Sequence, residues 1–228
     1  LMEHLPIAEK KYWLAYRQNE KIDWPIIKLL VKAFGSLERS WNRTDGLIDL
    51  GLTNLEKEEI KRVWLSYQPD QMLKETEKAG VRAVAIIEEG FPKLLAQISD
   101  PPFLLFYRGV LPSAKEICLA SVGTRKATSY GLRVVRDLIK PVAKKGVVIV
   151  SGLAYGIDQA SHQATLSIKG KTIAVLGDGV DKNSIYPHSN RMLASRIIRN
   201  GGCLISEYPV GIGPQKHFLW PGTGSLPA

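Results

Sequence analysis

Two short stretches of this chain combine glycines, hydroxyls and one arginine in the manner of loops that hold phosphate. In the first, Gly123 allows a tight turn, Thr124 offers a hydroxyl and an amide, and Arg125 offers a planar fork for two phosphate oxygens. In the second, small residues keep side chains away from backbone N–H groups that precede a helix. The residues of the second stretch are Ser151, Gly152, Leu153, Ala154, Tyr155 and Gly156. Together the two stretches indicate a ligand that carries phosphate.

Each stretch also has an ordinary structural interpretation. An arginine in a strand-to-helix loop is often only a surface residue, and glycine turns also serve close packing. Asp158, in the first turn of the next helix, is interpreted as a cap for backbone N–H groups, and His162 as a structural histidine. The sequence has no cysteine, histidine and aspartate set with metal-ligand spacing, no GxSxG elbow and no GxxxxGK[ST] loop. We therefore expect no metal, no cofactor and no nucleotide triphosphatase of the usual kind.

Short hydrophobic strands must position these loops. Runs that begin at Ile117, Val147, Thr172 and Cys203 each end in small residues, and helical stretches separate them. This alternation predicts an α/β fold with a parallel βαβ sheet, in which ligands bind at the carboxyl ends of the strands. The intervening helices are predicted at about 130–145, where Pro141 should kink or shorten the helix, and at about 157–168.

The chain ahead of this sheet divides into a helical part and a short mixed part. Helices are predicted at 22–34, ended by Gly35, at 37–42, 45–50 and 55–67, the last capped by Thr53 or Asn54, and at 71–79. Small helices with tight glycine turns suggest a SAM-like or helix-hairpin-helix module. Strands are predicted at 81–87 and 102–109, with a helical turn at 93–98. We place a helical domain at 1–72 and the sheet domain at 73–228.

The charge of the chain is unevenly distributed. The formal net charge is +9, yet residues 1–75 carry 12 basic and 12 acidic side chains, and residues 76–228 carry 19 and 10. The whole excess therefore belongs to the sheet half, where it would attract a polyanion. The neutral helical part is expected to serve packing or protein contact.

Cysteine usage and hydropathy indicate the cellular compartment that the sequence fits. Cys118 and Cys203 both fall in predicted strands and are expected to be small buried hydrophobes without a disulfide framework, which fits a reducing cytosol. The sequence LMEHLPIAEKKYW does not resemble a signal peptide, and no apolar run is long enough to span a membrane. We expect a cytoplasmic protein.

Several motifs, read in order, resemble the DNA-processing protein A family (DprA, also called Smf). The resemblance is strong over about 90–218 and loose over 1–89. The motifs that carry it are GFPKLLAQISDPPFLLFYRG (90–109), VGTRKATSYG (122–131), VSGLAYGIDQASH (150–162), GKTIAVLGDGVD (170–181), IYPHSN (185–190) and LISEYPVG (204–211).

The resemblance implies an extended Rossmann-like fold that binds single-stranded DNA instead of a dinucleotide. The family protects incoming strands in natural transformation, helps load the RecA recombinase in recombination, forms homodimers and has no established catalytic activity. Carried over by position, its phosphate pocket would consist of Gly123, Thr124 and Arg125 with Ser151, Gly152, Leu153, Ala154 and Gly156. Tyr155 stands where the family often has a basic residue, which removes a charge contact and offers a stacking surface.

The end of the chain departs most from the family. After Phe218 the family continues with a basic run like R-N-R-I-I-A-G, whereas this chain reads PGTGSLPA. If suitable codons for PGTGSLPA are read in a shifted frame, they encode R-N-R-I-I-A-G. We therefore expect residues from about Leu219 to be out of frame, so that the sheet is incomplete at its C-terminal end and the dimerisation surface is lost.

Three other functions are alternatives to DNA binding. Related lysine-decarboxylase-like Rossmann enzymes hydrolyse nucleotide phosphoribosyl bonds, but they need an acidic PGGxGTxxE motif, and Glu207 in SEYP lacks those glycines. A dinucleotide oxidoreductase would need GxGxxG after the first strand. The helical part could also act alone as an interaction module.

Overall fold

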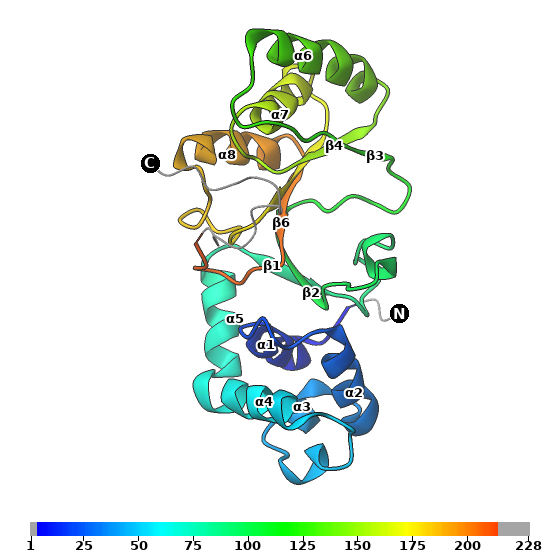
Figure 1. Cartoon of the computed structure of the whole chain (residues 1–228), viewed down its shortest axis with the longest axis vertical. Coiled ribbons are helices and arrows are strands. Elements are labelled where there is room, and N and C mark those ends of the chain that lie inside the picture. Colours follow the sequence, from blue (N-terminus) through cyan, green and yellow to red (C-terminus); the bar gives the residue numbers. More distant parts are fainter. Residues whose placement is uncertain (1–3, 214–228) are drawn as a thin grey trace.

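The computed structural model describes residues 4–213 of the chain. Figure 1 shows an elongated molecule with a group of helices at one end, a sheet in the middle and further helices over the sheet at the other end. The tail from Leu219, which the sequence predicts to be out of frame, lies outside the described residues.

Five α-helices and a short 3-10 turn form the N-terminal end, and their boundaries carry the expected capping signals. Asp23 accepts the N–H of Ile26 at the start of one helix, and Gly35 ends it with a left-handed φ of 81°. Thr53 and Glu56 form a reciprocal capping box at the start of another. The elements are α1 (Ile7–Tyr16), α2 (Trp24–Phe34), α3 (Leu37–Ser40), η1 (Asp45–Leu47), α4 (Asn54–Ser66) and α5 (Pro69–Lys78).

Buried aromatic residues hold these helices together. Tyr16, on α1, is fully buried, and its hydroxyl accepts the indole N–H of Trp64 at 2.8 Å and lies 3.1 Å from the hydroxyl of Ser40. Burial raises the pKa of Tyr16 to about 12. Trp13, also fully buried, packs its ring on Phe103, which precedes the second strand. The helical end is therefore fastened directly to the sheet.

The sheet has six strands in the order β1-β2-β6-β5-β4-β3. Strands β3 to β6 are parallel and form the predicted βαβ core, while β1 and β2 pair antiparallel with each other and β2 pairs antiparallel with β6. The sheet is thus mixed, and the two early strands extend it beyond its predicted start at Ile117. The strands are β1 (Arg82–Ala85), β2 (Leu104–Gly109), β3 (Cys118–Ala120), β4 (Val148–Ser151), β5 (Thr172–Leu176) and β6 (Cys203–Ser206).

Three crossover helices connect the parallel strands. They are α6 (Ser129–Lys144), α7 (Ile157–Ser167) and α8 (Arg191–Arg199). Because consecutive strands step in one direction across the sheet and crossovers are right-handed, all three helices cover the same face. Pro141 lies within α6, and the helix continues to Lys144. This arrangement brings the carboxyl ends of β3, β4, β5 and β6 to one edge.

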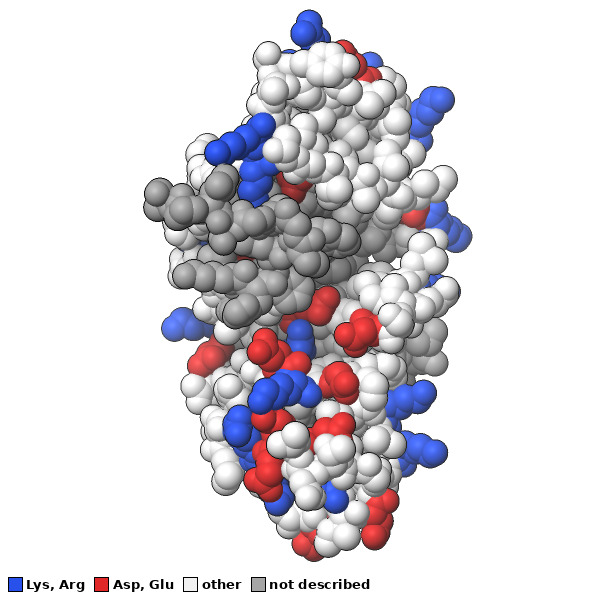
Figure 2. All heavy atoms as spheres, in the orientation of Figure 1, with Lys and Arg blue, Asp and Glu red and all other residues white. Residues whose placement is uncertain are grey.

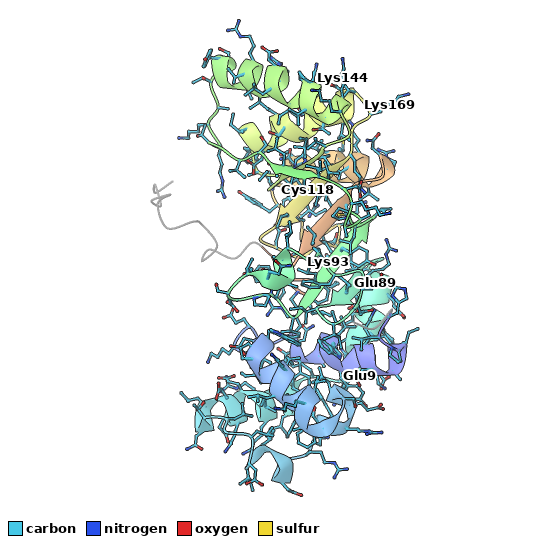
Figure 3. All side chains as sticks on the ribbon, turned by 90° about the vertical axis from the view of Figure 1, so that its right-hand side faces the viewer. Glu9, Glu89, Lys93, Cys118, Lys144 and Lys169 are labelled. Carbon is cyan, nitrogen blue, oxygen red and sulfur yellow. The ribbon has the colours of Figure 1, made fainter. Side chains whose placement is uncertain are left out.

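The cysteine prediction was half wrong. Cys203 is fully buried in the central strand β6, whereas Cys118 is exposed. Its strand β3 lies at the outer edge of the described sheet and all three of its residues are exposed. Figure 3 shows the molecule from the side of this edge. Cys118 lies at mid-height, and Lys144 and Lys169 lie toward the top, at the end away from the N-terminal helices. Edge position alone does not explain this exposure, because the opposite edge strand β1 buries Val84 and Ala85; the side chains of β3 lack covering neighbours among the described residues.

The helical end and the sheet share a continuous buried cluster. It runs from Trp13 and Ile60 in the helices to Phe106 and Leu204 in the sheet. Polar contacts reinforce the junction: the buried carboxylate of Glu88 accepts the N–H of Leu5 at 3.0 Å and the ammonium of Lys10 at 2.9 Å. The division at 1–72 and 73–228 stays a prediction. Over the described residues, the helices are too short or too polar to cross a membrane.

Candidate nucleic-acid interface

The first glycine loop follows β3 and is anchored by serines. The N–H of Ser121 donates to the carbonyl of Val150 at 2.8 Å, and the Ser151 hydroxyl donates to the carbonyl of Ser121 at 2.6 Å. The hydroxyls of Ser121 and Ser161 lie 2.7 Å apart. These contacts tie the end of β3 to the end of β4 and to α7, so the loop starts from a fixed point.

The two glycine loops are held against each other. A Cβ on Gly123 would lie 2.7 Å from a side-chain carbon of Ile157, and a Cβ on Gly156 would collide with the carbonyl of Thr124. Gly156 also has a φ of +76°, which only glycine adopts without strain. The N–H of Ile157 donates to that same Thr124 carbonyl at 3.2 Å. Both glycines are therefore required for the approach of the loops.

Arg125 projects from the tip of the first loop. Residues 122–126 are all exposed, and within residues 4–213 no hydrogen bond or ion pair occupies the Arg125 guanidinium. The N–H of Lys126 turns inward to the hydroxyl of Thr124 at 3.2 Å. Next, α6 begins with Thr128 accepting the N–H of Gly131 at 3.2 Å. An exposed guanidinium beside a helix N-terminus is suited to two-point contact with a phosphate.

The second glycine loop contains a strained residue. Leu153 has a φ of 59°, a left-handed conformation that is costly for a leucine, and its side chain is fully buried. The side-chain amide of Asn190 donates to the carbonyl of Leu153 at 2.8 Å and reaches that of Ala154 at 3.5 Å. Since Asn190 itself is fully buried, the third loop of the edge fixes the conformation of the second.

Asp158 lies beneath both loops. Its carboxylate accepts the N–H of Gly152 at 3.2 Å, and a Cβ on Gly152 would come within 2.7 Å of that oxygen. Burial raises the pKa of Asp158, whereas neighbouring backbone N–H groups, among them the bonded N–H of Gly152, act in the opposite direction. Asp158 thus binds a backbone N–H as the sequence indicated, but that N–H belongs to the second glycine loop, because α7 has no side-chain cap at its start.

His162 has the predicted structural role. It is fully buried, and its Nδ1 lies 2.8 Å from the hydroxyl of Thr172, which donates its own hydrogen to the carbonyl of Ile149. The imidazole is therefore the donor to Thr172. Burial lowers the pKa of His162 to about 4.

Two buried carboxylates order the third loop, after β5, and one of them joins it to the fourth loop, after β6. Asp178 accepts the N–H of Tyr186 at 3.0 Å, and its pKa is raised to about 6, chiefly by burial. Asp181 accepts the N–H of Gly211 at 3.0 Å and that of Ser184 at 3.2 Å. The side chains of Asp178 and Asp181 are both buried, so neither carboxylate lies at the surface of this edge.

The predicted site residues meet at this one edge but differ in how they could contact a ligand. Gly123, Thr124, Arg125 and Tyr155 are exposed, whereas Ser151 is buried with its hydroxyl bonded to the first loop. Leu153 could offer only backbone groups. The sequence interpretation missed Asn190 as a support, although it lies in the quoted IYPHSN motif.

Comparison with known proteins places these features in a family. Residues 82–220 match the family model described as DNA recombination-mediator protein A. The protein Smf of a Synechocystis species is 36% identical over 215 residues, covering 92% of this chain and 53% of its own length. The chain therefore spans about half the length of that relative.

Solved structures give the same result. DNA processing protein A from Streptococcus pneumoniae superposes with a TM-score of 0.74 at 30% identity, covering 94% of this chain and 71% of the other. A structure of DNA processing protein A from Helicobacter pylori, described for its single-stranded DNA binding mode, has a TM-score of 0.51 at 30% identity and covers 60% of each chain.

Proposed function

We propose that this chain, which belongs to the DNA recombination-mediator protein A family, binds single-stranded DNA across the carboxyl edge of its parallel strands. The observation that carries the proposal is the pair of interlocked glycine loops with the exposed Arg125 at their tip. The Helicobacter pylori relative, described for binding single strands, supports the choice of ligand.

In this proposal, binding involves capture without bond breaking. Arg125 contacts a phosphate through its fork, and the amides of the Thr124 and Ala154 regions contact neighbouring phosphates. The basic excess of residues 76–228 attracts the rest of the strand. A flexible single strand can follow loops that a stiff duplex cannot enter, so unpaired DNA is the preferred form.

Membership of the family supports a proposal for the wider role. We propose that the bound strand is incoming DNA in natural transformation, that the protein protects it and helps load the RecA recombinase for recombination, and that this takes place in the cytoplasm. The expected loss of the family's dimerisation surface stays a prediction for this chain.

The test is a fluorescence-anisotropy titration of the full chain with a single strand and a duplex of equal length. The single strand should bind more tightly. Arg125→Ala should weaken its binding uniformly across sequences and reduce the log–log salt slope by about one unit, because about one phosphate contact is lost.

Lys144→Ala is the matched control, because Lys144 ends α6 at the opposite end of the strands. It should leave the slope unchanged. Equal or tighter duplex binding would contradict the choice of ligand, and an unchanged slope in a folded Arg125→Ala variant would contradict the role of Arg125.

A further inference from the structure

The third loop, which follows β5, carries exposed aromatic rings that the proposed phosphate contacts do not involve. Tyr186 is 49% exposed, and its ring meets that of His188 edge-on with centroids 6.1 Å apart. His188 and Ser189 are also exposed. The planes of the two rings lie 77° apart, so they do not share one flat face, but each exposed ring offers an apolar face of the kind on which a nucleobase stacks.

The backbone beneath these rings is fixed. The Asp178 carboxylate holds the N–H of Tyr186 at 3.0 Å, and Nδ1 of His188 lies 3.1 Å from the carbonyl of Ile185. Ile185 and Pro187 are buried, so exposed and buried side chains alternate through the segment. A preorganised surface loses little conformational freedom when a ligand binds.

The same segment is joined to the second glycine loop. The Ser189 hydroxyl donates to the phenol oxygen of Tyr155 at 3.4 Å, and Asn190 donates to the carbonyl of Leu153 at 2.8 Å. Tyr155 is itself 44% exposed. Tyr155 is therefore joined through Ser189 to the segment that carries Tyr186 and His188, at the rim of the loops proposed to hold phosphate.

We propose that Tyr155, Tyr186 and His188 form an aromatic platform on which the bases of the bound strand stack while the glycine loops hold its phosphates. The platform rests on the proposed function and adds the group that contacts bases. Its ligand is any unpaired nucleobase, because every base has a π-face. Paired bases in a duplex are already stacked, so the platform also explains a preference for single strands.

The experiment compares an oligothymidylate with a strand of equal length whose residues are abasic, titrated against the full chain by anisotropy. The abasic strand keeps every phosphate and loses every base. Tyr186→Ala should weaken oligothymidylate binding on the order of fivefold to 100-fold, with little effect on the abasic strand and on the salt slope. Tyr186→Phe keeps the ring and should bind as the unmodified chain does.

Leu65→Ala, which removes an 86% exposed side chain on α4, is the control for a surface change away from the platform. Thermal unfolding confirms that each variant is folded. Tyr186→Ala binding oligothymidylate as tightly as the unmodified chain would overturn the platform, and so would an equal loss on both strands. If the unmodified chain bound neither strand, the proposed function would fail together with the platform.

Discussion

At the scale of single residues, two charged groups at the loop edge have contrasting surroundings. Arg125 is exposed and, within residues 4–213, without a polar partner, so its full charge is available to a ligand. Asp178 is only 4% exposed and is bonded to a backbone N–H. Arg125 therefore presents positive charge at the surface of the edge, whereas the Asp178 carboxylate is kept inside, where it orders the backbone.

The raised pKa of Asp178 makes a prediction about stability and pH. Its pKa is about 6 in the folded chain against 3.8 for an ordinary aspartate, so the folded state binds the proton more tightly. The stability that this proton contributes is present at low pH and is lost as pH rises from about 4 to about 6, by roughly 3 kcal/mol at most.

Asp178→Asn cannot ionise, and its amide oxygen can still accept the N–H of Tyr186. The variant should therefore gain stability relative to the unmodified chain as pH rises through that window. Urea unfolding at pH 4, 5, 6 and 7 measures the difference. Parallel stability curves for the two proteins would show that Asp178 does not titrate as described.

At the scale of elements, the loops form one unit because each is fastened to its neighbour. Ser151 bonds to the first loop, Asn190 bonds to the second, and Asp181 joins the third to the fourth. The close contact between the first two loops depends on Gly156, which lies against the carbonyls of Thr124 and Arg125. A change in one loop should therefore be felt in the next.

Gly156→Ala tests this coupling, with Gly146→Ala as its matched control. Both glycines have positive φ, +76° and +84°, but a Cβ on Gly146 would meet nothing within 4 Å. Both substitutions should cost about 1 kcal/mol or more in backbone strain, and only Gly156→Ala adds a collision. It should be the less stable in urea unfolding, and it alone should weaken binding to single strands. Equal effects on binding would show that the loops are not coupled through Gly156.

The helices and strands that could be predicted are those whose sequence signals lie within a few residues of the element. The cap Thr53, the stop Gly35 and the strand-to-glycine pattern after Val147 each act within a few residues, and the structure confirms the elements that they define. Helix α1 was not assigned because its apolar residues do not lie on one clear face, yet Trp13 and Tyr16 are fully buried by the helices and the strand segment around it.

Features that depend on distant neighbours were missed. The exposure of Cys118 depends on which neighbours cover β3, and no residue in that strand encodes those neighbours. The antiparallel pairing of β2 with β6 joins residues about 100 positions apart. In the sequence, Asn190 looks like an ordinary polar loop residue, and only the fold brings its side-chain amide to the carbonyl of Leu153. The loop residues of the candidate site were predictable because glycine and arginine carry the signal themselves.

At the scale of the whole molecule, charge separates the two ends. The basic excess lies entirely within residues 76–228. On the face shown in Figure 2, acidic and basic side chains gather together over the helical end, while the sheet end shows basic side chains with few acidic ones. This asymmetry would orient an approaching polyanion toward the sheet end before contact, and its effect should weaken as salt rises.

The central claim is that unpaired DNA lies across the interlocked loops, and amide hydrogen exchange with and without a saturating oligothymidylate tests it most directly. Exchange should slow at residues 121–131, 150–162 and 185–190, because a strand that contacts backbone amides and rings there shields them from water. It should stay unchanged in α2, α3 and α4. Slowing confined to those helices, with the loops unaffected, would contradict this account.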